Sequence, residues 1–334
     1  MIARTVAELR KTVDFTVIHH VTFAVDWMPC GLHSASTEIP TVWGPVGGST
    51  YVPASMFRWL GFRGTTHELA RAGTTKVLRR MFGDPMARSA SLTVALNDDV
   101  RRRFASRSDV VVEANAVIDI VHDRTCGAPA EPGTRGSKAV FVGRLVAWKG
   151  IRLALDSLKH PGAENWTLDF IGSGSERDWL EREVVRRGLK HRVLISGQMP
   201  RLDVLAAMQK ADALVFPSLH DSAGWVVAEA AAVGLPVICL DIGGPPELAG
   251  PNGHVVACDG NAAAEIAREL SFLESAQRPQ PSNRWSADRL PDYVDGWYER
   301  AEANWRVDHG IAESVGSDAL NVIARAHIGG KLRD

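Results

Sequence analysis

The stretch DALVFPSLHDSAGWVVAEAAAVGLPVICLD (212–241) contains two short apolar runs separated by a longer, alanine-rich run. The apolar runs 212–218 and 235–241 are short and rich in β-branched and aromatic residues, which predicts two buried strands. The segment 223–233 between them consists mainly of good helix formers. Parallel strands need a crossover connection, so this order predicts a βαβ unit in a parallel sheet.

The same alternation extends on both sides of this unit. Further strands are expected at KAVFVGRL (138–145), TLDFIG (167–172), RVLISG (192–197) and HVVAC (254–258). Helices are expected at 151–159, 176–187, 200–210 and 261–273. Strands that alternate with helices in this way favour a sheet covered on both faces, with its ligand site at the carboxyl edge.

The first 135 residues are less regular but are also predicted to be α/β. Strands are expected near 15–23, 40–43, 92–96 and 110–113, and helices near 65–82 and 98–106. The Gly- and Pro-rich stretch 123–138 indicates a linker. We therefore expect domains at 1–135 and 136–275, followed by a tail, 276–334, with a helix near 290–305.

The overall composition is that of a soluble globular protein. Of the 334 residues, 45% are hydrophobic and 23% are charged, and the net charge of −1 gives no reason to expect a nucleic-acid partner. Four cysteines lie far apart, which indicates neither a zinc site nor a disulfide framework. The N-terminus lacks the apolar core of a signal peptide, so we expect a cytoplasmic location.

Two acids on the 212–241 unit are candidate ligand-binding residues. Asp221 follows the first strand, and Glu229 lies eight residues later as the only charge between 222 and 240. A carboxylate in such apolar surroundings must meet a donor group, and eight helical residues span about 12 Å. The helix start at 222–225 offers amides and a positive dipole end that suit a phosphate. A solvent-facing Glu229 is the alternative.

Two cations follow the strand at 138–145. In FVGRLVAWKG (141–150), Arg144 and Lys149 are expected at the carboxyl edge of the sheet. Together they suit a diphosphate, because arginine offers a fork of donors and lysine a point charge. An unspecialised surface arginine and lysine are the alternative.

Six motifs in order over 138–258 resemble the retaining glycosyltransferases of family 4. They are VGRLVAWKG, DFIGSGSERDWL, ISGQMPR, ADALVFPS, DSAGWVVAEAAAVGLPVI and GGPPEL. IPTVWGPVGGSTYVP (39–53) is similar to a segment of the N-terminal domain in one branch of that family. The resemblance implies the GT-B architecture, an α/β fold of two Rossmann-like domains facing each other. It also implies retaining transfer of a sugar from a nucleoside-diphosphate donor to a hydroxyl of a glycan, glycolipid or small molecule, without a metal or cofactor.

The resemblance also assigns roles to residues. Arg144 and Lys149 would hold the donor diphosphate, and Glu229 would bind the ribose. Asp221, an Asp where the family usually has Glu, would contact sugar hydroxyls as a catalytic-site residue. The further donor-binding residues that it implies are Ser222, Ala223, Gly224 and Trp225, through their amides, and Gly197 and Met199 beside the nucleobase.

The N-terminal half holds a second catalytic candidate. The family often has a histidine at a strand end near the acceptor, and here His19 and His20 end the run FTVIHH. Side chains alternate along a strand, so only one of the pair faces the cleft, and we favour His20. Two structural histidines are the alternative. Gly47 and Gly48 either form a tight turn or let the backbone approach a ligand closely.

The region 58–107 is basic, with eleven basic and four acidic residues. Two interpretations stay open: peripheral contact with the inner face of an anionic membrane, or a solvated basic surface.

The N-terminal domain is expected to be incomplete. The family opens with a strand leading into a glycine-rich loop, but the first glycine here is Gly31 and the first strand-like run already holds the histidines. Lacking one or two βα units, the chain is expected to bind nucleotide and to transfer sugar weakly or not at all. The alternatives to a glycosyltransferase are a shortened or degenerate nucleotide-binding protein without turnover, and a related epimerase or phosphorylase.

Overall fold

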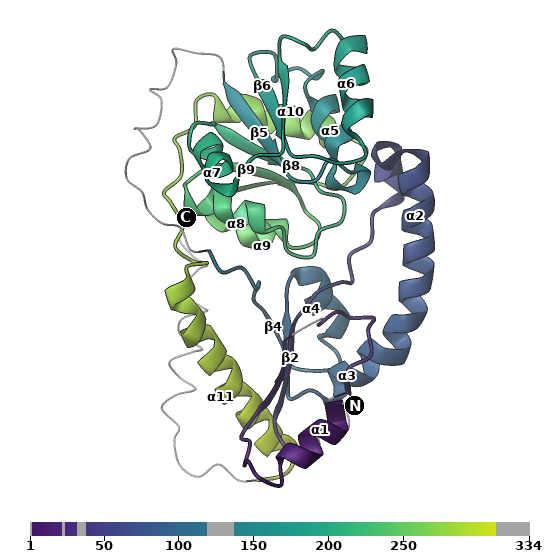
Figure 1. Ribbon diagram of the computed structural model, residues 1–334, viewed down its shortest axis with the longest axis vertical. Helices are drawn as coiled ribbons and strands as arrows, with labels where there is room; N and C mark the ends of the chain where they lie inside the picture. Colours follow the sequence, from purple (N-terminus) through teal and green to yellow (C-terminus); the bar gives the residue numbers. More distant parts are fainter. Residues whose placement is uncertain (1, 22–23, 32–37, 119–136, 312–334) are drawn as a thin grey trace, which may run out of the picture.

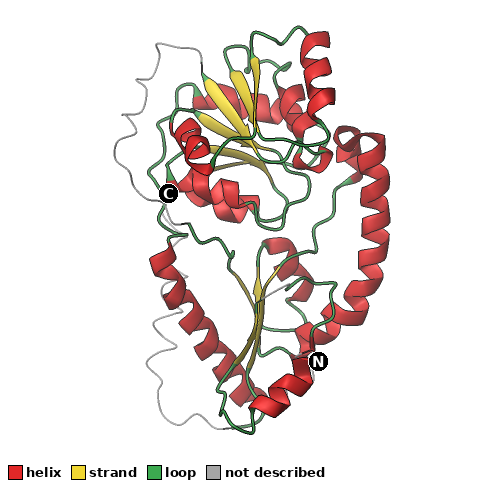
Figure 2. Cartoon of the chain, in the orientation of Figure 1, coloured by secondary structure: helices red, strands yellow, loops and turns green. Residues whose placement is uncertain are grey.

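A computed structural model describes residues 2–21, 24–31, 38–118 and 137–311. The described chain forms two α/β domains, one above the other in Figure 1, each built on a parallel sheet. Helices flank both sheets, and the loops at the strand ends lie between the domains (Figure 2). Within the described residues, no helix is long and apolar enough to cross a membrane.

The smaller sheet contains four parallel strands in the order β1-β2-β3-β4. These strands are β1 (Ile18–His20), β2 (Thr41–Val46), β3 (Leu92–Ala95) and β4 (Val110–Val112). The helices of this region are α1 (Ile2–Leu9), α2 (Phe57–Leu78), α3 (Asp84–Ser89) and α4 (Asp98–Phe104), with a π-helical turn, η3, at Arg79–Gly83. The four expected strands are confirmed, and the expected helix 65–82 begins earlier, at Phe57.

The larger sheet contains six parallel strands in the order β10-β9-β8-β5-β6-β7. They are β5 (Lys138–Val142), β6 (Thr167–Ile171), β7 (Val193–Gly197), β8 (Ala213–Phe216), β9 (Val237–Leu240) and β10 (Gly253–Val256). The helices are α5 (Ile151–Ser157), α6 (Arg177–Arg186), α7 (Arg201–Gln209), α8 (Trp225–Ala232), α9 (Pro245–Ala249) and α10 (Ala262–Leu273). All six expected strands and the five helices expected between and after them are present.

Apolar side chains cover both faces of the larger sheet, as expected for parallel strands. Along β5, Ala139 and Phe141 belong to one core cluster, whereas Val140 and Val142 belong to another. This alternation follows from the two-residue period of a strand. The run 139–142 is therefore apolar throughout because both of its faces are buried.

Two helices connect the domains in addition to the linker, most of which lies outside the described residues. The C-terminal helix α11 (Leu290–Asp308) returns to the smaller sheet, where Trp297 and Ala301 pack against Val42 and Val94. In the other direction, the segment 52–60 packs into the core of the larger domain. Figure 1 shows α2 and α11 running along opposite sides of the molecule.

Candidate active site

The loop after β8 is fixed against the smaller domain through Ser222. The Gly48 amide donates to the Ser222 hydroxyl at 3.2 Å, and Asn97 Nδ2 donates to the Ser222 carbonyl at 2.9 Å. A Cβ added to Gly47 would lie 3.3 Å from the Ser222 Cβ, so the two loops approach closely. The carboxyl edges of the two sheets thus meet at the loop that was predicted to bind the donor.

The start of α8 presents unused backbone donors at this junction. Gly224 precedes the helix with a φ of 88°, a conformation that glycine adopts without strain. Within the described residues, the amides of 222–224 donate no hydrogen bond. The Trp225 indole reaches across to Asn115 Oδ1 at 3.3 Å. Free amides at a helix start suit an anion, as expected for this loop.

Lys149 and Asp221, predicted to hold the diphosphate and the sugar, form an ion pair through Nζ and Oδ2. Their side chains are only 13% and 15% exposed. The Lys149 ammonium also lies 4.7 Å from the centroid of the Trp148 ring and 5.1 Å from that of Phe216. An ammonium has three donors, so Lys149 can keep Asp221 and still bind a phosphate oxygen.

Arg144 contributes a second cation on the same loop. Its guanidinium lies 5.2 Å from the Trp148 ring centroid, so both cations contact this ring. Arg144 is exposed, and within the described residues it makes no ion pair. Its five donors are therefore available to an anion.

Glu229 is mostly buried, which argues against the solvent-facing alternative. Its side chain is 15% exposed, and its Oε1 accepts a hydrogen bond from Arg201 Nε at 2.8 Å. Arg201 is the first residue of α7 and was not singled out from the sequence, although it ends the motif ISGQMPR. A ribose hydroxyl at Glu229 would share the carboxylate with this guanidinium.

The residues expected beside the nucleobase lie at and after the carboxyl end of β7, the edge strand of the larger sheet. Gly197 ends β7 with a φ of 76°, and its carbonyl accepts a hydrogen bond from the Gly172 amide at 2.8 Å. Met199 packs against the core cluster that includes Val227. Their contact with a base stays a prediction.

The two histidines point to opposite faces of β1. His19 Nε2 lies 2.8 Å from the Gly44 carbonyl and His19 Nδ1 lies 3.1 Å from the Tyr298 hydroxyl, so this ring joins β1 to α11. His20 pairs in register with Trp43, four residues before Gly47, which corresponds to about 13 Å of extended chain. Burial lowers the pKa of His20 below its usual range. Its proposed role in the cleft stays a prediction.

His220, which precedes Asp221, lies in a charged cluster that sequence reasoning missed. Burial, reinforced by the nearby Arg71 cation, lowers the pKa of His220 to about 4. Arg71 is paired with Glu68 on α2, and Glu68 Oε1 accepts the Val52 amide at 3.3 Å. The feature of the sequence that could have indicated this cluster is the His-Asp dipeptide after a predicted strand.

A second cluster that sequence reasoning missed is the buried pair Asp26–Arg79. Asp26 Oδ2 lies 2.7 Å from Arg79 Nε, and the two side chains are 0% and 1% exposed. The Ser49 hydroxyl donates to the same carboxylate oxygen. A Cβ on Gly48 would lie 2.1 Å from Asp26 Oδ1, so the GPVGG glycines permit close approach of the backbone to a protein carboxylate.

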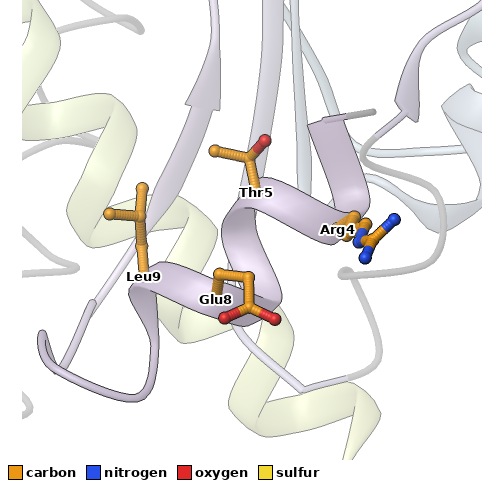
Figure 3. A pocket seen from close by; sticks show the side chains of 4 residues that line it. All are labelled: Arg4, Thr5, Glu8 and Leu9. Atoms are coloured by element: carbon orange, nitrogen blue, oxygen red, sulfur yellow. The ribbon is translucent and has the colours of Figure 1, made fainter.

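Two hollows accompany these elements. A cavity of about 490 Å³ between the domains is lined by Ser49 and Tyr51 on one side and by Asp241 and Cys258 on the other. The second hollow lies along α1 and is lined by Arg4, Thr5, Glu8 and Leu9 (Figure 3). None of the predicted site residues lines the hollow at α1. Among the described residues, no three His, Cys, Asp or Glu side chains gather in a way that could hold a metal ion.

Comparison with known proteins shows what the larger domain is similar to. Residues 130–288 match the family model of the glycosyl transferases group 1. The chain is 32% identical to glycogen synthase of Mycobacterium tuberculosis over 227 residues, which cover 64% of this chain and 52% of that protein. It is 28% identical to the 2-deoxystreptamine glucosyltransferase of Streptomyces kanamyceticus over 199 residues, 53% of this chain and 51% of that one. The chain thus spans about half the length of these relatives.

A solved structure supports the fold over most of the chain. The crystal structure of a GtfA/B complex matches with a TM-score of 0.53 and 15% identity, covering 91% of this chain and 58% of that chain. The expected GT-B fold, with two α/β domains whose carboxyl edges meet, is confirmed. Residues 130–288 are thus similar to the glycosyl transferases group 1 family.

Proposed function

We propose that this protein transfers a sugar from a nucleoside-diphosphate donor to an acceptor hydroxyl, with retention at the anomeric carbon. The observation that carries the proposal is the contact of Lys149 with Asp221 directly before the unused amides at the start of α8. This arrangement sets a cation, a carboxylate and free N–H groups within one loop junction. A diphosphate with a sugar attached has the complementary groups.

The cations and amides supply the main catalytic effect in this proposal. When the bond from the anomeric carbon to the diphosphate breaks, negative charge develops on the leaving phosphate oxygen. Arg144, Lys149 and the amides of 222–224 are fixed donors for that charge, and fixed donors of this kind need no reorganisation during the reaction. Retention requires the acceptor oxygen to bond on the face that the diphosphate leaves, with its proton passing to the released diphosphate.

The carboxylates orient the donor. Asp221 is held by Lys149 and accepts hydrogen bonds from sugar hydroxyls, while Glu229 does the same for the ribose. Two relatives are named glycogen synthase and 2-deoxystreptamine glucosyltransferase, and by those names they act on different acceptors. The acceptor of this chain is therefore proposed only as a hydroxyl compound that enters between the domains.

The test is incubation with UDP-, GDP- and ADP-sugars and a panel of sugar, lipid and small-molecule acceptors. We expect nucleoside diphosphate release with a product whose anomeric configuration, seen by proton NMR, equals that of the donor. Arg144→Ala and Lys149→Ala should each lose activity, whereas Lys190→Ala, which precedes β7 at the amino edge of the larger sheet, should not. Binding of nucleotide without release, or equal activity in all three variants, would contradict the proposal.

A further inference from the structure

The basic region 58–107 separates into paired and unpaired cations. Arg71, Arg79, Arg101, Arg102, Arg103 and Arg107 all form ion pairs with Asp or Glu. In contrast, Arg63, Lys76 and Arg80 have no carboxylate partner within the described residues. All three are exposed, and all lie on α2 or the π-helical turn η3 that continues it. The unpaired charge thus lies mainly on this element, and Arg88 on α3 is a further exposed cation that makes no ion pair within the described residues.

The same element exposes large apolar side chains. Phe62 is 85% exposed, Leu69 is 56% exposed, and Val77 and Met81 are both 58% exposed. At 100° per residue, Phe62, Leu69 and Val77 fall within about 80° around the helix axis. The stripe from Phe62 to Met81 extends for roughly 28 Å at 1.5 Å per residue. We call these four side chains, with Arg63, Lys76 and Arg80, the outer face of α2.

The buried side of the helix holds its acid. Glu68, the only acid of α2, is buried and paired with Arg71, and Thr75 is also buried. The outer face therefore combines apolar side chains and cations without an acid. Figure 1 shows α2 along the outside of the molecule.

We propose that the outer face of α2 docks onto an anionic lipid bilayer. An interfacial helix typically combines exposed apolar side chains with flanking cations. Helix α2 has both, and it is not apolar enough to cross a membrane. Charge complementarity selects anionic headgroups, since each cation near such a surface strengthens binding by about fivefold. The apolar stripe selects a bilayer over a purely polyanionic partner such as a nucleic acid. This inference is independent of the proposed donor and acceptor.

The test is cosedimentation of the full chain with phosphatidylcholine vesicles, with and without phosphatidylglycerol. We expect binding only to the anionic vesicles and loss of binding near 1 M salt, where charges are screened beyond about 3 Å. The triple variant Arg63→Gln, Lys76→Gln, Arg80→Gln should bind about a hundredfold more weakly. Phe62→Gln with Leu69→Gln should also reduce binding by more than tenfold.

Matched variants on α6 and after it provide the control for net charge. Arg182→Gln, Arg186→Gln, Lys190→Gln removes the same charge from exposed positions of the larger domain and should bind like the wild type. Unchanged circular dichroism and melting temperature show that each variant is folded. Absence of wild-type binding, equal losses in the two triple variants, or equal binding to duplex DNA that persists in the Phe62→Gln, Leu69→Gln variant would overturn the proposal.

Discussion

Breaking the buried pair Asp26–Arg79 should destabilise the smaller domain more than removing both charges. The two side chains are 0% and 1% exposed, so Arg79→Met leaves an uncompensated carboxylate in the interior. The expected loss is about 3–5 kcal/mol of unfolding free energy, a large part of a typical domain's total. In Asp26→Asn with Arg79→Met, no charge remains buried, and the side-chain carbonyl of the introduced asparagine still accepts the Ser49 hydroxyl. This double variant should therefore recover at least half of the loss.

Urea unfolding followed by circular dichroism measures the effect without adding salt. With a slope of about 2 kcal/mol/M, Arg79→Met should lower the midpoint of the first transition by on the order of 2 M. The exposed pair Arg177–Glu181 is the control, and Arg177→Met should change stability by less than about 1 kcal/mol. If the separately measured losses of Arg79→Met and Asp26→Asn simply add in the double variant, the pair is not coupled and the reasoning is refuted.

Further predictions concern the donor site, pH and the C-terminal helix. Glu229→Ala should weaken UDP or GDP binding by about 10- to 150-fold in calorimetry, because a hydrogen bond to a charged group contributes about 1.5–3 kcal/mol; equal affinity would exclude the ribose role. Asp221→Glu should raise transfer activity if this position contacts the sugar, whereas no effect on any kinetic parameter would indicate that it does not. The pKa of His220 in the folded chain is about 4, below the ordinary 6.5, so the unfolded chain takes up the proton first and stability falls as pH drops from about 6.5 to 4. His220→Gln should remove about 2 kcal/mol of that pH dependence between pH 7.5 and pH 5, as measured by urea unfolding at both pH values, and an unchanged difference would contradict it. Trp297→Ala should cost about 3–5 kcal/mol, since the cluster that joins α11 to the smaller sheet has few other members; a loss below 1 kcal/mol would show that α11 is not needed there.

The strand and helix order was predictable because it depends on local periodicity. Parallel strands buried on both faces are continuous apolar runs, and those at 138–145 and 235–241 were visible without any structure. The sequence predicted that Lys149 and Asp221 lie at the same edge of the sheet, but it did not predict their ion pair. Two residues 72 positions apart reach each other because β5 and β8 are neighbours in the sheet.

The buried charges were not predictable from the sequence. Asp26 and Arg79 carry no motif, and their contact depends on Gly48 and Gly83 leaving space for the carboxylate and its backbone. The pairing of Glu229 with Arg201 likewise depends on how α7 packs beside α8. Tertiary packing decides such contacts, whereas local patterns decide the elements that carry them.

The basic region 58–107 also shows that the sequence alone does not predict which charges are paired. Its charge count from the sequence suggested one continuous surface. The structure pairs Arg101 and Arg102 with Asp98, and pairs Arg103 with Asp84. Among the described residues of 58–107, most of the cations without an ion pair lie on α2 and the turn after it, and these are the candidates for a partner.

The most direct test of the donor site is calorimetric titration of UDP, GDP and ADP into the wild type and Lys149→Ala. Removing Lys149 takes away one cation and leaves Asp221 unpaired beside the diphosphate. We therefore expect the wild type to bind at least one of the three nucleotides and Lys149→Ala to bind it at least about tenfold more weakly. Lys210→Ala, at the far end of α7, should match the wild type. Equal affinity of Lys149→Ala and the wild type, or no binding of any nucleoside diphosphate, would contradict the assignment of this edge as the donor site.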